Sequence, residues 1–424
     1  MKILVVGGGG REHALAYAFA KTSTVYCLPG NPGSATVATN LPGSPSNASI
    51  VIDAVRAHHI DLVVVGPEAP LAAGLADALN AADIRVFGPS ARAARIESSK
   101  AYAKDLMRRA GVPTATSRTF TGLADARVYI ETHAEPLVVK ASGLAAGKGA
   151  IVCETRAAAL AAASEMFGGR FGDAGSEVIV EAFLEGEELS VLAITDGERV
   201  MLLPPAQDHK RLGEGDRGPN TGGMGAYTPV SIATPYLLDA VVTKVIDPVL
   251  RQMMTEGDRF RGVLYAGLMC GADGEPAVVE FNCRFGDPEA QVVLPAVRAD
   301  LAEHCWRVAA GEPWSPRERL PAERAVVTTV IAAGGYPEAP HQGAVITIPD
   351  HLPEATLLFH AGTSRDAGGT LRAAGGRVLC ATGLGDTVAE AAMRSRQLAA
   401  AVSFEGAQYR RDIAWREVAR VGAS

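Results

Sequence analysis

The stretch Leu137–Val152 reads LVVKASGLAAGKGAIV and joins two short apolar runs through a loop that is rich in glycine. The first run ends at Lys140, and a second lysine, Lys148, stands in the loop. Glycine next to lysine is typical of phosphate binding, but a Walker A loop has serine or threonine after its lysine, and here Gly149 follows. We therefore expect a β-hairpin whose loop closes over a polyphosphate as a lid, with a flexible surface loop as the alternative.

The chain before this hairpin predicts a different kind of unit. Lys2–Val6 is an apolar run followed by four glycines and a helical pattern. A similar apolar run followed by a glycine–proline turn recurs in DLVVVGPE at 61–68 and in IRVFGPS at 84–90. One helix is expected near Leu71–Ala82, after the first of these turns. Such alternation predicts an open parallel sheet, whose ligands lie at the carboxyl ends of the strands.

The whole chain is expected to fold as a multidomain protein, α/β followed by α+β. An N-terminal parallel-sheet domain spans 1–101. A second domain, 102–324, contains the hairpin within an α+β subdomain at about 119–190, and short strands with glycine turns predict a small C-terminal domain, 325–424.

The composition excludes several classes of protein. The 424 residues are 48% hydrophobic with a net charge of −7, which favours a folded protein with a large core and argues against a nucleic-acid-binding surface. Six cysteines without a CxxC motif indicate reduced thiols, and no apolar run approaches the ~18 residues of a membrane helix. The expected location is the cytoplasm.

Three turns at strand ends are candidates for binding a substrate phosphate. The loop Gly7–Gly10 lies between a strand and a helix, where backbone N–H groups and the helix N-terminus favour a monophosphate. A dinucleotide site and a bare turn are the alternatives, although the final glycine of GxGxxG is absent. The two other turns are Asn31–Gly33 and Gly66–Glu68. The candidate residues of the three turns are Gly9, Gly10, Arg11, Asn31, Gly33, Gly66, Pro67 and Glu68.

The segment VIVEAFLEGEELS contains a candidate nucleoside site. Glu181 ends an apolar strand, Phe183 is apolar, and Glu188 follows a turn. These side chains suit an adenine amine, an adenine face and ribose hydroxyls, although solvated surface glutamates would show the same pattern.

The segment VVEFNCRFGDPEAQ follows a hairpin turn expected at Asp273–Gly274 and contains a candidate metal site. Strand alternation places Glu280, Asn282 and Arg284 on one face. The first two offer the hard oxygen ligands that Mg²⁺ prefers, and the arginine could hold a carboxylate. A solvated strand face is the alternative.

A long polar loop is expected over Pro204–Tyr227, and long loops inside compact domains more often take part in binding or catalysis than serve only as connections. Asp208 and Lys210 could bind an amino group and a phosphate or carboxylate. His209 between them is more typical of a solvated loop histidine.

Together these motifs resemble the glycinamide ribonucleotide synthetase (phosphoribosylamine–glycine ligase) family of the ATP-grasp superfamily. The resemblance covers nearly the whole chain, through GGGGREHAL, SSKAYAKDLM, KASGLAAGKGA and, most specifically, QDHKRLGEGDRGPNTGGMGAYTP and EFNCRFGDPE. It implies an ATP-grasp core of two α+β subdomains in which the 143–149 loop is the lid. It also implies a nucleotide site of Lys100, Lys140, Gly143, Gly147, Lys148, Gly149, Glu181, Phe183 and Glu188.

The resemblance further implies ATP-dependent joining of glycine to 5-phosphoribosylamine through glycyl phosphate, in purine biosynthesis. Mg²⁺ or Mn²⁺ would be held by Glu280 and Asn282, with Arg284, Asp208 and Lys210 as catalytic residues. Only small-molecule partners and a monomer are expected, and another ATP-grasp carboxylate–amine ligase is the alternative.

The chain departs from the family pattern at two places. Ser142 stands where the family usually has aspartate, and Gly262–Cys270 offers no further acid for a metal ion.

Overall fold

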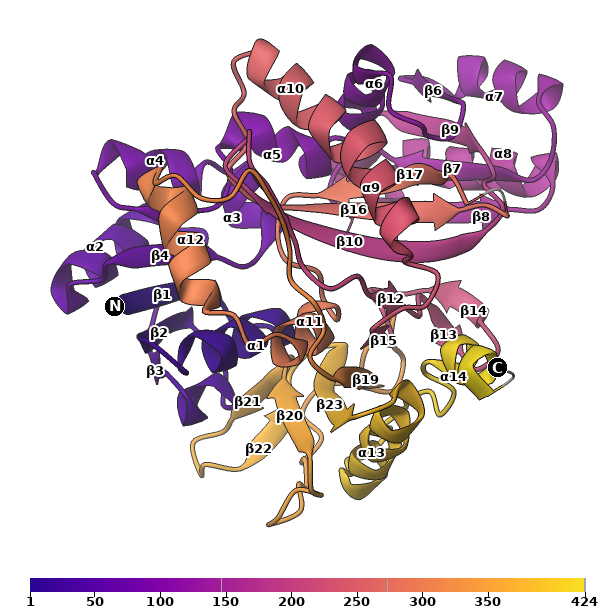
Figure 1. Cartoon of the computed structure of the whole chain (residues 1–424). Coiled ribbons are helices and arrows are strands. Elements are labelled where there is room, and N and C mark those ends of the chain that lie inside the picture. Colours follow the sequence, from indigo (N-terminus) through magenta and orange to yellow (C-terminus); the bar gives the residue numbers. More distant parts are fainter. Residues whose placement is uncertain (146, 273, 423–424) are drawn as a thin grey trace.

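The computed structural model describes residues 1–145, 147–272 and 274–422, and is built on four main sheets (Figure 1). Ala146 of the expected lid loop and Asp273 of the expected hairpin turn lie outside the described residues. Among the residues described, no helix is both long and apolar enough to cross a membrane. All six cysteines are buried and free, as predicted for reduced thiols.

The N-terminal unit is the predicted open parallel sheet, with strand order β3-β2-β1-β4-β5. Its strands are β1 Lys2–Gly7, β2 Thr24–Pro29, β3 Thr39–Asn40, β4 Leu62–Val65 and β5 Val86–Phe87, and its helices are α1 Gly10–Phe19, α2 Ala48–His58, α3 Glu68–Ala72, α4 Leu75–Ala81 and α5 Ala91–Ser98. The single helix expected over Leu71–Ala82 is wrong. Gly74 has a φ of +87° there, which ends α3 and begins α4.

The lid unit is a four-stranded antiparallel sheet with order β6-β9-β7-β8, packed against two helices. It comprises β6 Ser117–Phe120, α7 Leu123–Thr132, β7 Leu137–Ala141, β8 Ala150–Cys153, α8 Arg156–Glu165 and β9 Val178–Ala182. Strands β7 and β8 form the expected hairpin, with Lys140 opposite Ala150. Helix α6, Lys100–Ala110, precedes this unit and is capped by the hydroxyl of Ser99.

A five-stranded sheet with order β17-β16-β10-β11-β18 forms the second half of the middle unit, where an ATP-grasp core is expected (Figure 1). Its elements are β10 Glu187–Thr195, β11 Val200–Leu202, β16 Gly262–Cys270, β17 Pro276–Asn282 and β18 Arg317–Arg319. A long helix runs through α9 Pro235–Val241, a π-helical turn at Val242–Ile246 and α10 Asp247–Thr255. Helices α11 Ala290–Ala296 and α12 Leu301–Ala310 follow.

The C-terminal sheet has the order β12-β15-β19-β23-β20 and takes two strands from the middle of the chain. Those two, β12 Gln207–Asp208 and β15 Gly225–Thr228, lie within the segment expected to be a loop, as does the hairpin of β13 Arg211–Gly213 and β14 Arg217–Asn220. The loop prediction was therefore wrong, because β12 pairs with β15 and β13 with β14 inside the segment, and β15 also pairs with the distant β19. The remaining elements are β19 Ala325–Ala332, β20 Thr356–His360, β21 Thr363–Arg365, β22 Leu371–Ala373, β23 Arg377–Gly385, α13 Val388–Ala401 and α14 Trp415–Gly422.

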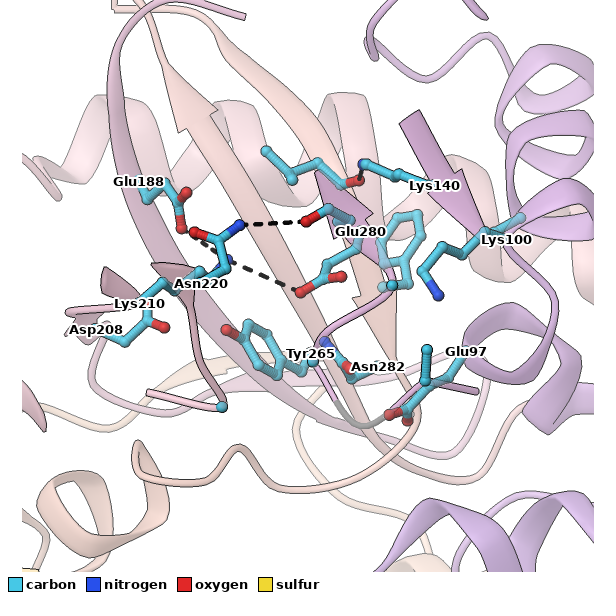
Figure 2. A pocket seen from close by; sticks show the side chains of 18 of the residues that line it. Glu97, Lys100, Lys140, Glu188, Asp208, Lys210, Asn220, Tyr265, Glu280 and Asn282 are labelled. Atoms are coloured by element: carbon cyan, nitrogen blue, oxygen red, sulfur yellow. Dashed lines mark hydrogen bonds and ion pairs between the residues drawn. The ribbon is translucent and has the colours of Figure 1, made fainter. Parts of the chain in front are cut away.

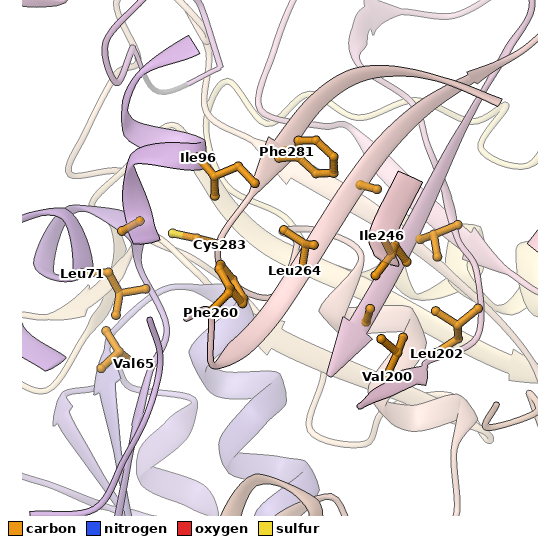
Figure 3. Packing of buried hydrophobic residues seen from close by; sticks show 14 of the residues in the cluster. Val65, Leu71, Ile96, Val200, Leu202, Ile246, Phe260, Leu264, Phe281 and Cys283 are labelled. Atoms are coloured by element: carbon orange, nitrogen blue, oxygen red, sulfur yellow. The ribbon is translucent and has the colours of Figure 1, made fainter. Parts of the chain in front are cut away.

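One hydrophobic cluster joins the N-terminal unit to the five-stranded sheet of the middle unit (Figure 3). Leu71 and Ile96 belong to the same cluster as Leu264 and Phe281, and each is at most 3% exposed. Burying such side chains contributes about 1.5–3 kcal/mol each. This packing fixes the position of α5 and α6 against β17, where the candidate site lies.

Candidate active site

A cavity of about 410 Å³ is lined by the lid sheet, by β16 and β17, and by α5 and α6. It brings together many of the side chains predicted from distant parts of the sequence. The predicted site residues on its wall are Arg11, Glu68, Lys100, Lys140, Gly147, Gly149, Glu181, Phe183, Glu188, Asp208, Lys210, Glu280, Asn282 and Arg284. Gly9, Gly10, Asn31, Gly33, Gly66, Pro67, Gly143 and Lys148 are not part of it.

One part of the cavity, here called the lysine end, is formed by Lys100, Lys104, Lys140 and Glu181. The Nζ atom of Lys140 lies 3.0 Å from Glu181 Oε2 and donates to the carbonyl of Val279 at 3.0 Å. Lys104 reaches the other carboxylate oxygen at 3.3 Å. Burial lowers the pKa of Lys104 to about 8, although Glu181 opposes that change. The carboxylate of Glu181 is thus held between two lysines.

The base of the lid loop is tied to the start of α6. Lys100 Nζ donates to the carbonyl of Gly143 at 3.1 Å, and its backbone N–H donates to the carbonyl of Ser142. The hydroxyl of Ser142 accepts the N–H of Ala101 at 3.1 Å. Ser142, one of the two departures from the resembled family, therefore supplies a hydrogen bond to the helix N-terminus, a position that also suits a carboxylate.

The described part of the lid loop lies against the segment that follows β14. Gly147 has a φ of +77°, and a Cβ there would stand 3.3 Å from the Cα of Gly222. Lys148 is exposed. The loop thus meets the 221–222 segment across the cavity.

Glu280 stands in the centre of the cavity, between the lysines and the 208–221 hairpin (Figure 2). Lys210 Nζ is 2.7 Å from Glu188 Oε2 and 3.9 Å from Glu280 Oε1. Burial alone would raise the pKa of Glu280, but Lys210, Lys140 and Lys100 outweigh it and lower that pKa. Burial raises the pKa of Asp208 well above its usual range, with Glu289 and Glu188 adding to the effect.

A second part, here called the arginine end, contains Arg11, Arg284 and Arg377 with Glu68 and Asp287. Arg284 donates to Glu97 Oε1 at 2.8 Å, to Glu68 Oε2 at 3.3 Å and to Asn282 Oδ1 at 3.2 Å. Its guanidinium is therefore already held by two carboxylates.

Arg11 from the N-terminal unit and Arg377 from the C-terminal sheet complete the arginine end. Arg377 lies 3.1 Å from Asp287 Oδ2 and donates to the carbonyls of Asp287 and Gly222. Arg11 bonds Glu12 Oε1 at 2.6 Å and lies 3.9 Å from Glu68.

The glycine loop Gly7–Gly10 lies beside this end, but several of its backbone polar groups are already bonded to the side chains of Glu12 and Asn31. The N–H of Gly9 donates to Glu12 Oε2 at 2.6 Å, in a capping box at the start of α1. The amide of Asn31 donates to the carbonyls of Gly8, Gly9 and His360. A Cβ on Gly9 would stand 3.8 Å from Asp287 Oδ2, so the loop approaches the cavity there.

Comparisons with known proteins agree with this architecture. The family models for the phosphoribosylglycinamide synthetase N domain, ATP-grasp (A) domain and C domain match residues 1–97, 98–290 and 326–416. The chain belongs to the phosphoribosylglycinamide synthetase family. The family and fold expected from the sequence motifs are thereby confirmed.

Relatives of the phosphoribosylglycinamide synthetase family match over their full length. A phosphoribosylamine–glycine ligase of Rhizobium meliloti is 47% identical over 99% of each chain, and that of Yersinia pestis is 44% identical over 99% of this chain and all of its own. The crystal structure of the Thermotoga maritima phosphoribosylamine–glycine ligase has a TM-score of 0.84 at 34% identity and covers 97% of this chain. A biotin carboxylase domain from Hydrogenobacter thermophilus shares the fold, with a TM-score of 0.73 at 17% identity and coverage of 96% of this chain and 91% of its own.

Glu280 and Asn282 fit the divalent metal ion that ATP-grasp ligases use with ATP. Both line the cavity near the end of β17, and both present hard oxygen ligands. Among the described residues no group of three or more His, Cys, Asp or Glu side chains could hold a metal ion by itself.

Several cavity residues of this synthetase were not predicted. Lys104 follows Lys100 by one helical turn on α6, so its spacing could have revealed it. Glu97, Tyr265 and Arg377 gave no comparable local pattern. The full set of unpredicted polar side chains is Glu97, Lys104, Asn220, Thr221, Tyr265, Asp287, Glu289 and Arg377.

Proposed function

We propose that this chain joins glycine to 5-phosphoribosylamine, with ATP converted to ADP and phosphate. The observation that carries the proposal is the succession of three phosphoribosylglycinamide synthetase domain matches along one chain, around one cavity with a cationic and an oxygen-rich wall. The cavity supports phosphoryl transfer, since that reaction requires positioning and neutralisation of charge more than a protein nucleophile.

ATP would lie at the lysine end, under the loop that contains Gly143, Gly147, Lys148 and Gly149. Lys100 and Lys140 face the phosphates there. Phe183, 38% exposed at the cavity wall, offers an apolar surface to the adenine, and Glu188 lies within reach of ribose hydroxyls. Glu181 would act chiefly by holding Lys140 and Lys104 in place.

Mg²⁺, or Mn²⁺ in its place, would be held by Glu280 and Asn282 and would neutralise phosphate charge when bound. Arg284, next to Asn282, would orient the glycine carboxylate toward the γ-phosphate. The carboxylate oxygen attacks phosphorus, the bond from the γ-phosphorus to the bridging oxygen of ADP breaks, and glycyl phosphate forms.

The amine of 5-phosphoribosylamine then attacks the acyl carbon, phosphate leaves, and the nitrogen loses a proton. Asp208, whose pKa burial raises, suits acceptance of that proton. Lys210 beside it suits stabilisation of the charge on the departing phosphate. Closure of the lid would exclude water from the hydrolysable acyl phosphate.

The sugar phosphate would lie at the arginine end. Arg11 and Glu68 lie on the cavity wall, and the remaining candidates are the turns that pack behind them, with Gly9, Gly10, Asn31, Gly33, Gly66 and Pro67. We further propose a monomeric, cytoplasmic enzyme with small-molecule partners only.

A second candidate is another ATP-grasp carboxylate–amine ligase, because biotin carboxylase domains share the fold. The deciding experiment measures ADP release with glycine and 5-phosphoribosylamine, each omitted in turn. We expect ADP release to require both substrates, with one glycinamide ribonucleotide formed per ADP. Release that depends on bicarbonate or on a different carboxylate would overturn the proposal.

A further inference from the structure

The 208–221 hairpin supplies two sides of the cavity although its own tip lies outside it. Asp208 and Lys210 enter the cavity at its start, and Asn220 and Thr221 at its end (Figure 2). The two ends are joined, since the N–H and the hydroxyl of Thr221 both donate to the carbonyl of Lys210 at 2.8 Å. Whatever fixes the body of the hairpin therefore fixes the base of the Lys210 side chain.

The body of the hairpin is held by a segment from the other end of the sequence, Gln408–Ala414. Arg410, only 1% exposed, donates to Asp216 Oδ1 at 2.8 Å and to the carbonyl of Arg211 at 3.1 Å. Its two other nitrogens donate to the two carboxylate oxygens of Asp412, each at 2.8 Å. One buried guanidinium thus joins the first strand of the hairpin and its turn to the C-terminal segment.

Two further contacts strengthen the same connection. The N–H of Gly215 donates to Asp412 Oδ2 at 2.8 Å, and the N–H of Ala414 donates to His209 Nε2 at 2.9 Å. Because Nε2 accepts, His209 is neutral with its proton on Nδ1, which lies 3.6 Å from Asp216. The expectation of a solvated loop histidine is wrong, since His209 is 2% exposed and lies in this connection.

The C-terminal segment is itself firmly anchored. Gln408 exchanges two backbone hydrogen bonds with Ala332 of β19, at 2.8 and 2.9 Å. Direct hydrogen bonds therefore connect the C-terminal sheet to the segment of Arg410, and Arg410 to the residue next to Lys210.

We propose that Arg410 is a positioning residue that holds Lys210 in its place between Glu188 and Glu280. Arg410 does not line the active-site cavity and acts only through the hairpin. This inference rests on the proposed function, since it requires Lys210 to contribute to ligation.

The test is a double-mutant cycle of Arg410→Lys and Lys210→Ala, with steady-state kinetics in ATP and glycine. Lysine keeps the charge but cannot bond Asp216, Asp412 and the Arg211 carbonyl together. A displacement of about 1 Å costs on the order of 100-fold in rate, so Arg410→Lys should lower kcat roughly 10- to 100-fold and leave the ATP KM within about twofold. In the Lys210→Ala background the same change should lower kcat less than about threefold, because coupled residues are not additive.

Two further variants separate positioning from loss of folding. Asp216→Asn removes the charge that Arg410 holds while keeping the side-chain size, and should reproduce the kcat loss and the non-additivity. Arg394→Lys is the matched control, because Arg394 pairs with Glu390 on α13 and does not touch the hairpin; its kcat should stay at the wild-type level.

Equal kcat losses from Arg410→Lys with and without Lys210 would overturn the inference and leave the ligase function intact. Near-normal turnover of Lys210→Ala would overturn both the inference and the role given to Lys210. Failure of the proposed function is a different result, in which the wild-type chain releases no ADP that depends on glycine and 5-phosphoribosylamine.

Discussion

The two ends of the cavity are built in different ways. The lysine end comes from residues 100–181, in α6 and the lid sheet, and its cations are lysines around one carboxylate. The arginine end combines Arg11, Arg284 and Arg377 from the three domain units, and each arginine is paired with acids or carbonyls.

This difference has a physical consequence. A lysine ammonium is a compact charge that can exchange its partner for a phosphate, whereas an arginine fork fixes several groups in one geometry. We expect the lysine end to bind a substrate that arrives and leaves with the lid, and the arginine end to be a rigid platform. The following experiments test that distinction.

The largest effect is expected at Glu280, which lies between the two ends. Glu280→Gln keeps the side-chain shape but removes the charge that faces Lys210, Lys140 and Lys100. We expect kcat to fall about 10²- to 10³-fold, the usual cost of losing one preorganised electrostatic group. The measurement is steady-state ADP release at saturating substrates.

The matched control is Glu318→Gln, on β18 at the opposite edge of the same sheet. It should retain wild-type turnover. A Glu280→Gln enzyme with near-normal kcat would mean that β17 has only a structural role.

Lys140→Ala tests the lysine end alone. Removing this cation should lower kcat/KM for ATP roughly 10- to 100-fold, within the range found for single charge-stabilising groups. The glycine KM should change less than about twofold, because Glu181 remains paired with Lys104. Lys148→Ala should lower kcat/KM for ATP less, since Lys148 is exposed on the lid; the reverse order would contradict the placement of the phosphates.

The lysine end could be predicted from the sequence more completely than the arginine end. Lys140, Glu181 and Phe183 stand in or next to short strand motifs that could be recognised, and Lys100 follows from the family resemblance; all four line the cavity. The parallel sheet and the lid hairpin were likewise visible in local periodicity.

Arg377 could not be predicted, because it enters the cavity only through the pairing of β23 with β19. Strand β15 was missed for the same reason, since its partner β19 lies far away in sequence, and β12 pairs only with β15. Contacts between distant segments leave no local periodicity to read.

Arg377→Lys tests the arginine end. Lysine keeps the charge but cannot hold Asp287 and the carbonyl of Gly222 together. We expect the KM for 5-phosphoribosylamine to rise about 5- to 20-fold, corresponding to one lost charge-assisted hydrogen bond of roughly 1–2 kcal/mol. The ATP KM should stay unchanged, and an enzyme whose ATP KM rises instead would show that the two ends are not separate.

The smallest effect concerns a contact between α1, which begins next to Arg11 of the arginine end, and β20. The N–H of His360 donates to His13 Nδ1 at 2.9 Å, and both rings are at most 9% exposed. Burial lowers the pKa of His13 to about 3 and that of His360 to about 4. Both histidines are therefore neutral in the folded protein at pH 5.5.

The unfolded chain protonates these histidines near pH 6.5, so between pH 6.5 and their folded pKa values it binds more protons than the folded protein. The free energy of unfolding must then decrease as the pH falls, by about 1.4 kcal/mol per buried histidine between pH 7.5 and 5.5. His360→Gln should make this decrease smaller by about that amount, as measured by urea denaturation at the two pH values. The exposed control His351→Gln should leave it unchanged, and an equal decrease in wild type and His360→Gln would show that the contact between α1 and β20 does not depend on a neutral histidine pair.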